Sequence, residues 1–382
     1  MKLSLVISGL DTGGAEMMLL KVLERLGPGF SPHVISLTPR IEIGPRIRAL
    51  GIPVESLGMH PGIPDPRAIL RLARRLRELN PDVVHTWMYH ADLLGGLAAR
   101  LAGMPAVGWA IHHSNLSPAA NKRSTLAVAR ACSRLSHCLP DRILCCSEVA
   151  RKVHVEYGYA TDKMMVVPNG FDLSLFRPDR FARDAVRQEL GLGPDVPLVG
   201  LIGRFDPQKN HAGFLQAAGL LHRKMSEVHF LLAGKGVDRG NAKLLQGIEE
   251  SDLHGFTHLL GLRTDVPRLM AALDVLVSSS IGEAFPNVLG EAMGCCVPCA
   301  VTDVGDSAWI VGDTGWVVPV GDMAGLAKAM EELLAMPPAE RKILGERART
   351  RVSEKFEIGN IVEQYKVFYA ELAALGQRRR DH

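Results

Sequence analysis

Two glutamates that stand eight positions apart, Glu283 and Glu291, are the residues whose chemistry is easiest to specify. Between them, Pro286 suits the first turn of a helix, where its missing N–H costs nothing. We therefore expect Glu283 in the loop before that helix and Glu291 on the helix, with both carboxylates facing one crevice. Carboxylates accept hydrogen bonds from sugar and ribose hydroxyls, and the amino end of a helix attracts a diphosphate. The alternative is two solvated surface glutamates.

A second candidate is a pair of cations, Arg204 and Lys209, in the segment Gly203–Asn210 that follows an apolar run. When a nucleoside diphosphate leaves a sugar, negative charge grows on its β-phosphate. Cations held at that point stabilise the transition state more than the ground state. The guanidinium of Arg204 can bind phosphate through two hydrogen bonds, whereas Lys209 supplies a compact charge. The alternative is a turn with incidental surface cations.

The glycine-rich segment Gly9–Glu16 is a third candidate. Gly13 and Gly14 allow the backbone to approach a phosphate or an acceptor closely. The segment lacks the Gly-Lys-Ser/Thr of a P-loop and is not a full Gly-x-Gly-x-x-Gly dinucleotide motif. By itself it is a weak indication of a binding loop.

Histidines are the fourth set of candidates. His112 and His113 follow an apolar run, and either ring could form a hydrogen bond with a donor sugar or its phosphate. His85 and His90 are weaker candidates for contact with an acceptor. For each of them the alternative is a structural histidine at the end of a strand.

These residues need elements to position them, and strand and helix patterns alternate along both halves of the chain. Regular alternation is typical of right-handed βαβ units with a parallel sheet. In the first half the expected strands are 3–7, 33–37, 82–85, 106–111, 142–146 and 165–167, and the expected helices are 15–26, 66–79 and 91–102. In the second half the expected strands are 198–202, 228–233, 256–260, 275–278 and 298–302, and the expected helices are 211–223, 241–250, 265–273 and 286–294.

The pattern predicts an α/β protein of two Rossmann-like, doubly wound domains that face a cleft. The domains are expected at 1–175 and at 198–357. Residues 176–197, which contain three prolines, are expected to be the linker, and a helix within 358–382 is expected to return toward the first domain. Because ligands bind beyond the carboxyl ends of the strands in open parallel sheets, we expect the chemistry in the loops at that edge.

Composition and charge describe an ordinary globular enzyme with an uneven charge distribution. Of its residues, 47% are apolar and 22% are charged, as is usual for a globular enzyme. Its length of 382 residues exceeds what one hydrophobic core usually organises, so two domains are expected. Residues 1–170 carry 20 Lys/Arg and 13 Asp/Glu, a net +7, whereas the rest carry 24 and 28, a net −4. A basic first half suits an anionic acceptor or one on a membrane surface, approached through the basic stretches 70–79 and 122–134. Domains that merely differ in surface charge are the alternative.

Cysteine usage indicates a reducing compartment. Seven cysteines with two adjacent pairs make a poor disulfide framework, and Cys296 and Cys299 lack a second ligand pair at zinc spacing. Residues 296–301 instead suggest a buried strand. The apolar stretch at 1–8 is too short for a signal peptide, and no apolar run reaches membrane-spanning length. We expect a cytoplasmic protein, soluble or peripheral to a membrane, without a nucleic-acid partner.

Together these segments resemble the family-4 retaining glycosyltransferases (glycosyl transferases group 1) of the GT-B fold. The resemblance covers nearly the whole chain and rests on the opening glycine segment, Pro168–Asp172, Gly203–Asn210 and the Glu283/Glu291 pair. The last two segments are fairly specific in this order and spacing, and the first two are supportive.

The resemblance implies that the domain at 1–175 is on the acceptor side and that the domain at 198–357 binds the nucleotide sugar. It also implies a role for each candidate residue. It implies that Arg204 and Lys209 bind the donor diphosphate, and that Glu283 contacts the transferred sugar and Glu291 the ribose. A first-domain histidine would touch the sugar as a fourth catalytic residue; the family usually has one there, so the doubled His112-His113 leaves the assignment open, with His113 favoured. The implied donor-binding residues are Gly13, Gly14, Phe285, Pro286, Asn287, Val288, Leu289 and Glu291, and the acceptor candidates are His85, His90 and His112.

The implied activity is retaining transfer of a sugar from a nucleotide-diphosphate donor to a hydroxyl of a glycan, polysaccharide or lipid-linked acceptor. Members of the family generally need no metal, and no Asp-x-Asp stands between strand and loop here. The alternatives are another GT-B-like enzyme, such as a sugar-nucleotide epimerase or a phosphorylase, and a non-catalytic sugar-nucleotide sensor. The sequence does not fix the nucleotide base or the sugar.

Overall fold

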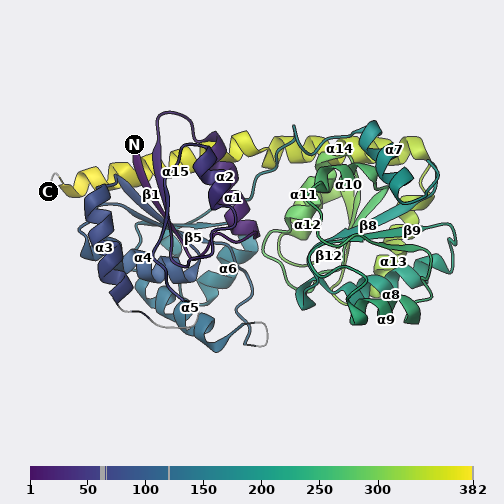
Figure 1. Cartoon of the computed structure of the whole chain (residues 1–382), viewed down its shortest axis with the longest axis horizontal. Helices are drawn as coiled ribbons and strands as arrows, with labels where there is room; N and C mark the ends of the chain where they lie inside the picture. Colours follow the sequence, from purple (N-terminus) through teal and green to yellow (C-terminus); the bar gives the residue numbers. More distant parts are fainter. Residues whose placement is uncertain (61–64, 66, 119–120, 381–382) are drawn as a thin grey trace. The chain divides into compact units, whose positions relative to one another are not determined.

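The computed structural model describes residues 1–60, 65, 67–118 and 121–380. They form two compact units (Figure 1). The first unit comprises Met1–Gly170 together with Ile358–His382, and the second comprises Phe171–Glu357. The first unit is therefore built from both ends of the chain.

The first unit is organised around a parallel sheet. Its strands are β1 (Lys2–Ile7), β2 (Ser31–Ser36), β3 (Val54–Ser56), β4 (Val83–Trp87), β5 (Val107–Ile111), β6 (Arg142–Cys145) and β7 (Met164–Val166). Their spatial order is β3-β2-β1-β4-β5-β6-β7, and each neighbouring pair is parallel. The order of the strands thus reverses between β1 and β4.

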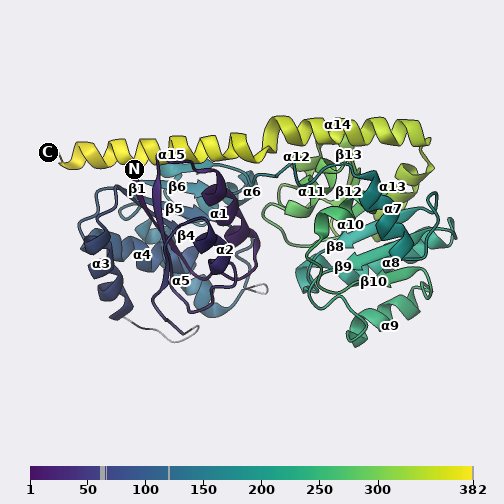
Figure 2. The same ribbon diagram turned by 45° about the horizontal axis from the view of Figure 1, so that its top comes forward.

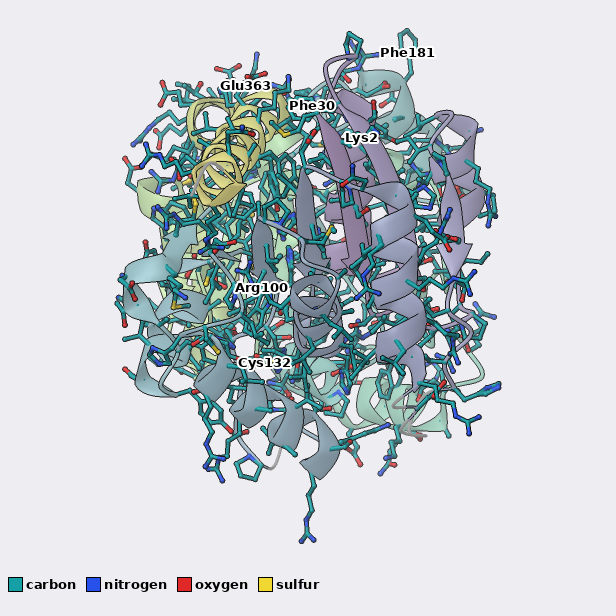
Figure 3. The ribbon with its side chains drawn as sticks, turned by 90° about the vertical axis from the view of Figure 1, so that its left-hand side faces the viewer. Lys2, Phe30, Arg100, Cys132, Phe181 and Glu363 are labelled. Atoms are coloured by element: carbon teal, nitrogen blue, oxygen red, sulfur yellow. The ribbon has the colours of Figure 1, made fainter. Side chains whose placement is uncertain are left out.

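Helices cover both faces of this sheet, because successive side chains of a strand point to opposite faces. Leu5 and Ile7 pack on the side of α1, whereas Val6 packs on the side of α3 to α6. Figure 3 shows Glu363, on α15, and Cys132, on α5, at opposite sides of the sheet. The helices are α1 (Gly14–Arg25), α2 (Gly44–Ala49), α3 (Arg67–Leu79), α4 (Tyr89–Leu101), α5 (Arg123–Leu135), α6 (Glu148–Glu156) and α15 (Ile358–Arg380), with a short turn η1 (Thr161–Lys163).

Helix α15 supplies part of the core of the first unit (Figure 2). Tyr365, Phe368 and Leu372 of this helix are fully buried. Gly108 of β5 leaves room for them, since a Cβ atom there would lie 2.8 Å from side-chain atoms of both Phe368 and Leu372. The close approach of α15 to the sheet therefore depends on a glycine.

The second unit repeats this architecture. Its strands are β8 (Leu198–Ile202), β9 (His229–Ala233), β10 (Thr257–Leu259), β11 (Val275–Ser278), β12 (Cys299–Thr302) and β13 (Gly315–Val318). They are parallel in the order β10-β9-β8-β11-β12-β13, which reverses between β8 and β11. The helices are α7 (Arg180–Glu189), α8 (His211–His222), α9 (Ala242–Glu250), α10 (Val266–Ala272), α11 (Asn287–Gly294), α12 (Ser307–Val311), α13 (Met323–Ala335) and α14 (Pro338–Phe356), with the turns η2 (Pro207–Lys209) and η3 (Gly312–Thr314).

Residues 176–197, expected as a linker, contain helix α7 and lie within the second unit. Arg187 of α7 is almost fully buried, and its guanidinium donates to Asp274 Oδ2 at 2.7 Å. Arg183 donates to the other oxygen of Asp274, also at 2.7 Å. Asp274 directly precedes β11, so these ion pairs hold α7 at the start of a central strand.

The expected fold class of two Rossmann-like parallel sheets is confirmed, but several individual elements were not predicted. The sequence reading missed the short elements α2, β3, α6, α12 and β13 and the longer helices α13 and α14. The expected helix start at Pro66 lies outside the described residues. The prediction of a strand from residue 296 was wrong. Cys296 has a left-handed φ of 59° and ends the turn after α11, so β12 begins only at Cys299.

Candidate functional site

The candidate residues of the second unit flank the point where its strand order reverses. Because β8 lies between β9 and β11, the connections that follow β8 and β11 diverge there. Ligands of open parallel sheets bind at such a point, beyond the carboxyl ends of the strands. Arg204 and Lys209 follow β8, and Glu283 follows β11.

Lys209 and Glu283 are in direct contact. The Nζ atom of Lys209 donates to Glu283 Oε1 at 2.5 Å, and the hydroxyl of Ser280 donates to the same oxygen at 2.8 Å. Only 24% of the Lys209 side chain and 12% of the Glu283 side chain are exposed. Solvent ions screen such a half-buried pair less than a surface pair. The structure thus fixes a cation beside a group that accepts hydrogen bonds from hydroxyls.

The loops that carry these two residues are also joined through their backbones. The N–H of Ile281 donates to the carbonyl of Gln208 at 2.8 Å, and the hydroxyl of Ser279 lies 3.0 Å from the carbonyls of both Lys209 and Asn210. Asn210 has a left-handed φ of 52°, which asparagine tolerates, and its side chain caps α8. Lys209 is therefore held in place by its neighbours on both sides.

Arg204 lies on the exposed part of the same loop. About 61% of its side chain is exposed, and its Nε donates to Asp206 Oδ2 at 3.0 Å. Burial opposes ionisation of Asp206, but the N–H of Gln208 and the guanidinium of Arg204 together lower the pKa of this carboxyl. The structure brings Lys209 and Glu283 together and leaves Arg204 on the solvent side of their loop.

Helix α11 begins one residue later than the sequence suggested, with Pro286 as the residue before its first turn. Asn287 opens the helix, and Glu291 lies half-buried one turn further on. The side chains of Phe285 and Leu289 are buried, so at these two positions the backbone is the part that can meet a ligand. The expected contact between the backbone of this segment and the donor stays a prediction.

The glycine-rich segment of the first unit forms the turn between β1 and α1. Gly13 precedes the helix and Gly14 is its first residue. The hydroxyl of Thr12 donates to Glu42 Oε2 at 3.0 Å. Since β1 flanks the reversal of strand order, this turn occupies the place in the first unit that Gly203–Asn210 occupies in the second.

The proposed contact of His85 with an acceptor is not supported by its position. His85 lies on β4 on the face covered by α15, has no exposed surface, and places Nδ1 3.1 Å from the hydroxyl of Tyr369. Burial lowers the pKa of His85 to about 3, so its ring is neutral at physiological pH. An acceptor cannot reach a side chain enclosed in this way, and we assign His85 to the core.

The two adjacent histidines point to opposite faces of the first sheet, as successive residues of an extended chain do. The ring of His112 stacks on Trp87, with centroids 4.8 Å apart and planes 10° apart. Burial lowers the pKa of His112 to about 4. On the other face, Nε2 of His113 lies 3.1 Å from Oδ1 of Asn121. The two rings therefore have different surroundings, and the choice of His113 for contact with the sugar stays a prediction.

The remaining acceptor candidate, His90, is exposed in the first turn of α4. Sequence reasoning overlooked Ser279 and Ser280, which contact the catalytic candidates directly. A signal was present, since serines directly follow the strand that ends at Ser278. Polar side chains at the carboxyl end of a buried parallel strand are well placed to join a site.

Two other features bear on cofactors and location. Within the described ranges, no cluster of three or more His, Cys, Asp or Glu side chains is arranged to hold a metal ion. Among those same residues, no helix combines the length and apolarity needed to cross a bilayer. All seven cysteines carry free thiols.

Comparison with known proteins agrees with this geometry. Residues 12–175 match the family model described as Glycosyltransferase Family 4, and residues 196–336 match the model described as Glycosyl transferases group 1. The chain is 25% identical over 315 residues to the UDP-Gal:alpha-D-GlcNAc-diphosphoundecaprenol alpha-1,3-galactosyltransferase of Escherichia coli, covering 81% of this chain and 80% of that protein. It is 32% identical over 196 residues to the N-acetyl-alpha-D-glucosaminyl L-malate synthase of Bacillus anthracis, covering half of each chain.

Solved structures show the same fold. HepE of Anabaena, crystallised with UDP and glucose, superposes with a TM-score of 0.85 at 22% identity, over 97% of this chain and all of that one. Sucrose-phosphate synthase of Thermosynechococcus elongatus superposes with a TM-score of 0.82 at 22% identity, over 98% and 99% of the two chains. The two family matches fall on the two halves of a GT-B fold. The chain therefore belongs to family 4 of the glycosyltransferases, the group-1 retaining enzymes that transfer a sugar from a nucleotide sugar to an acceptor.

Proposed function

We propose that the chain transfers a hexose from a UDP-sugar to a hydroxyl of a lipid-linked saccharide, with retention at the anomeric carbon. The contact between Lys209 and Glu283 at the strand-order reversal carries the proposal, because it sets a phosphate-binding cation beside a hydroxyl-binding carboxylate. The choice of UDP and of a lipid-linked acceptor follows the Escherichia coli relative, whose name specifies both.

Each site residue has a distinct role in this proposal. Lys209 and Arg204 bind the diphosphate, with Arg204 exchanging its present partner Asp206 for a phosphate oxygen. Glu283 binds hydroxyls of the transferred sugar, and Glu291 binds the ribose. The N–H groups at the start of α11 and the turn at Gly13 face phosphate oxygens, and His113 contacts the sugar.

The reaction needs no strong protein base. The bond between the anomeric carbon and the phosphate oxygen breaks, and the acceptor oxygen bonds to that carbon from the same face. The departing phosphate oxygen takes the acceptor's proton. Lys209 and Arg204 stabilise the charge that develops on the diphosphate, a task that a preorganised cation performs well in a half-buried site.

Because Lys209 and Arg204 can neutralise the charge of the diphosphate, we propose that transfer proceeds without a metal. The test is turnover in EDTA and after addition of Mg²⁺ or Mn²⁺. We expect the same rate within about twofold in all three conditions, as these side chains supply the charge that a metal would supply otherwise. Loss of activity in EDTA that Mg²⁺ restores would contradict the proposal.

We further propose that the enzyme works in the cytoplasm, on the surface of an anionic membrane. The free thiols suit a reducing compartment. Helix α5 is the part of the first unit that we expect to contact the membrane. The sequence has no acidic residue between Asp92 and Asp141, and the exposed cations of α5 therefore have no acidic neighbour in sequence. Such a surface attracts acidic lipid headgroups.

The decisive experiment replaces Lys209 by alanine. Loss of a preorganised cation should lower kcat by roughly 100-fold. Lys224→Ala is the matched control, because it removes an exposed ion pair with Glu331 at the opposite end of α8 and should leave kcat unchanged. Full turnover by the Lys209→Ala variant would contradict the proposal.

Product analysis separates the alternatives. Mass spectrometry should show the acceptor heavier by one hexose and release of UDP. A sugar-nucleotide epimerase would return an isomeric nucleotide sugar of unchanged mass. A non-catalytic sensor would bind the donor without consuming it across a broad panel of acceptors, and either result would replace the proposed transfer.

A further inference from the structure

A buried hydrogen-bonded pair lies beside His113 and has no role in the proposal so far. The hydroxyl of Tyr89, the first residue of α4, is 2.6 Å from Nε2 of His154 on α6. His154 has no exposed surface and Tyr89 is 6% exposed. A buried polar pair of this kind needs a physical reason.

The protons of this pair have one consistent arrangement. Nδ1 of His154 lies 2.7 Å from the carbonyl of Ala150, which can only accept, so Nδ1 carries the ring proton. Burial lowers the pKa of His154 to about 4, with the Ala150 carbonyl opposing, and the ring is therefore neutral. Burial raises the pKa of Tyr89, so its hydroxyl keeps its proton. Tyr89 accordingly donates to Nε2, and this bond fixes the position of the hydroxyl end of its side chain.

The ring of Tyr89, anchored at its hydroxyl end and buried, contacts the ring of His113. The two rings are 6.1 Å apart between centroids and cross at 89°, an edge-to-face contact of the kind that aromatic pairs prefer. His113 also contacts Asn121, through Nε2. Tyr89 therefore limits the orientation of the His113 ring from one side, and Asn121 from another.

The backbone at Tyr89 is constrained as well. Met88, which precedes it, has φ 73° and ψ 153°, a region that residues with a side chain rarely enter. Hydrogen bonds hold this strained residue in place, since its N–H donates to Ala110 and its carbonyl accepts from Asp92. Strain of this kind persists only where the surroundings determine the conformation, and it clusters at functional sites.

We propose that Tyr89 and His154 are positioning residues that hold the ring of His113 in the orientation in which it contacts the transferred sugar. Neither touches substrate. The inference rests on the proposed function, because it assumes that His113 is the sugar-contacting histidine. Misplacing a contacting group by a small distance lowers the rate of the chemical step, whereas binding of the nucleotide part of the donor is unaffected.

The test compares Tyr89→Phe, which keeps the ring and removes the hydroxyl, with Tyr89→Leu, which removes the ring. We expect kcat to fall roughly 3- to 10-fold in the first and 10- to 100-fold in the second, with KM for the donor within about twofold of the parent enzyme. Tyr159→Phe is the matched control, since Tyr159 packs on the same His154 and donates its hydroxyl to Ala129. That control should leave kcat unchanged.

A double-mutant cycle with His113→Ala separates positioning from general packing. In the His113→Ala background, Tyr89→Phe should lower kcat no further, because the group that it positions is gone. Independent, additive losses would overturn the positioning role, as would an equal loss of kcat in Tyr159→Phe. Full activity of His113→Ala alone would overturn the proposed sugar contact and this inference with it, whereas a reduced rate of His113→Ala with additive effects would overturn the inference alone.

Discussion

Glu283 Oε1 accepts two hydrogen bonds of different strength, one from the ammonium of Lys209 and one from the hydroxyl of Ser280. The charged bond is the stronger of the two, but the hydroxyl fixes the direction of the carboxylate. Ser280→Ala should therefore lower stability by about 1 kcal/mol and kcat by less than about tenfold, well short of the effect of Lys209→Ala. Urea unfolding and steady-state rates for both variants test this order. A larger loss of kcat in Ser280→Ala than in Lys209→Ala would show that the serine has its own catalytic role.

Buried histidines make stability depend on pH below neutrality. Burial lowers the pKa of His85 to about 3 and that of His154 to about 4, whereas the pKa in an unfolded chain is about 6.5. Between these values the unfolded state binds more protons, so the free energy of unfolding falls as pH drops from about 6.5 toward 4.

Each such histidine should contribute a slope approaching about 1.4 kcal/mol per pH unit within that window. Urea unfolding at pH 7, 6 and 5 measures the total slope. In His85→Phe, which no longer titrates at this position, the slope should be smaller by that amount. An unchanged slope in the variant, or equal stability at pH 7 and pH 5, would contradict the assignment of His85 to the core.

Sequence reasoning could nominate these histidines but could not distinguish them. His85 and His113 both stand at the ends of apolar runs. They differ in burial, which depends on the elements that cover each face of the sheet. The cover of His85 is α15, which is more than 270 residues away in the sequence. Lys209 and Glu283 were recognisable because each lies in the loop that follows a strand of the same unit. The spacing of a motif predicts such positions, whereas burial depends on distant packing.

Helix α7 is held by a charge cluster in addition to its buried Ala182 and Val186. Arg187 and Arg183 each bind one oxygen of Asp274, and the N–H of Leu198 binds Asp274 Oδ2 at 2.8 Å. Asp274→Ala should lower the free energy of unfolding by about 3–5 kcal/mol, because Arg187 is then buried without its partner.

Chemical unfolding of Asp274→Ala against Asp184→Ala tests the value of this cluster. Asp184 forms an exposed ion pair with Arg180, so its removal should cost less than about 0.5 kcal/mol. Similar losses in the two variants would contradict a structural role for Asp274. The sequence could not reveal this cluster, because the partners are 87 residues apart and prolines on both sides of α7 suggested a linker.

Helices α3 and α5 are both basic, but their charges are balanced differently. Arg71 and Arg75 of α3 form ion pairs with acidic side chains, whereas the structure shows no ion pair for Arg130 or Arg134 of α5 among the residues it describes. A membrane surface should therefore engage α5. Reversal of both α5 charges to glutamate should weaken binding to vesicles that contain acidic lipid by roughly tenfold or more.

The matched control reverses Arg71 and Arg75 of α3 instead, and we expect a smaller effect because these charges are already neutralised within the protein. Co-sedimentation with acidic and with neutral vesicles at low and moderate salt gives the comparison. Equal binding to both kinds of vesicle, unaffected by salt, would rule out the membrane surface proposed for this enzyme.

At the scale of the whole molecule, the chain forms two units with separate hydrophobic cores. Helix α15 contributes to the core of the first unit, and the second unit contains Lys209 and Glu283. Because each unit has its own core, we expect two unfolding transitions in calorimetry. UDP at a hundred times its Kd should stabilise the second unit by about 2.7 kcal/mol and leave the first transition in place.

Gly108→Val gives the complementary perturbation. Its added side chain meets Phe368 and Leu372 of α15, so it should destabilise the first unit by about 1–3 kcal/mol. In this variant the transition of the first unit should move to lower temperature, while the shift produced by UDP in the other transition is retained. If UDP raised the transition that Gly108→Val lowers, the donor nucleotide would belong to the first unit, and the assignment of Lys209 and Glu283 to the donor diphosphate would have to be abandoned.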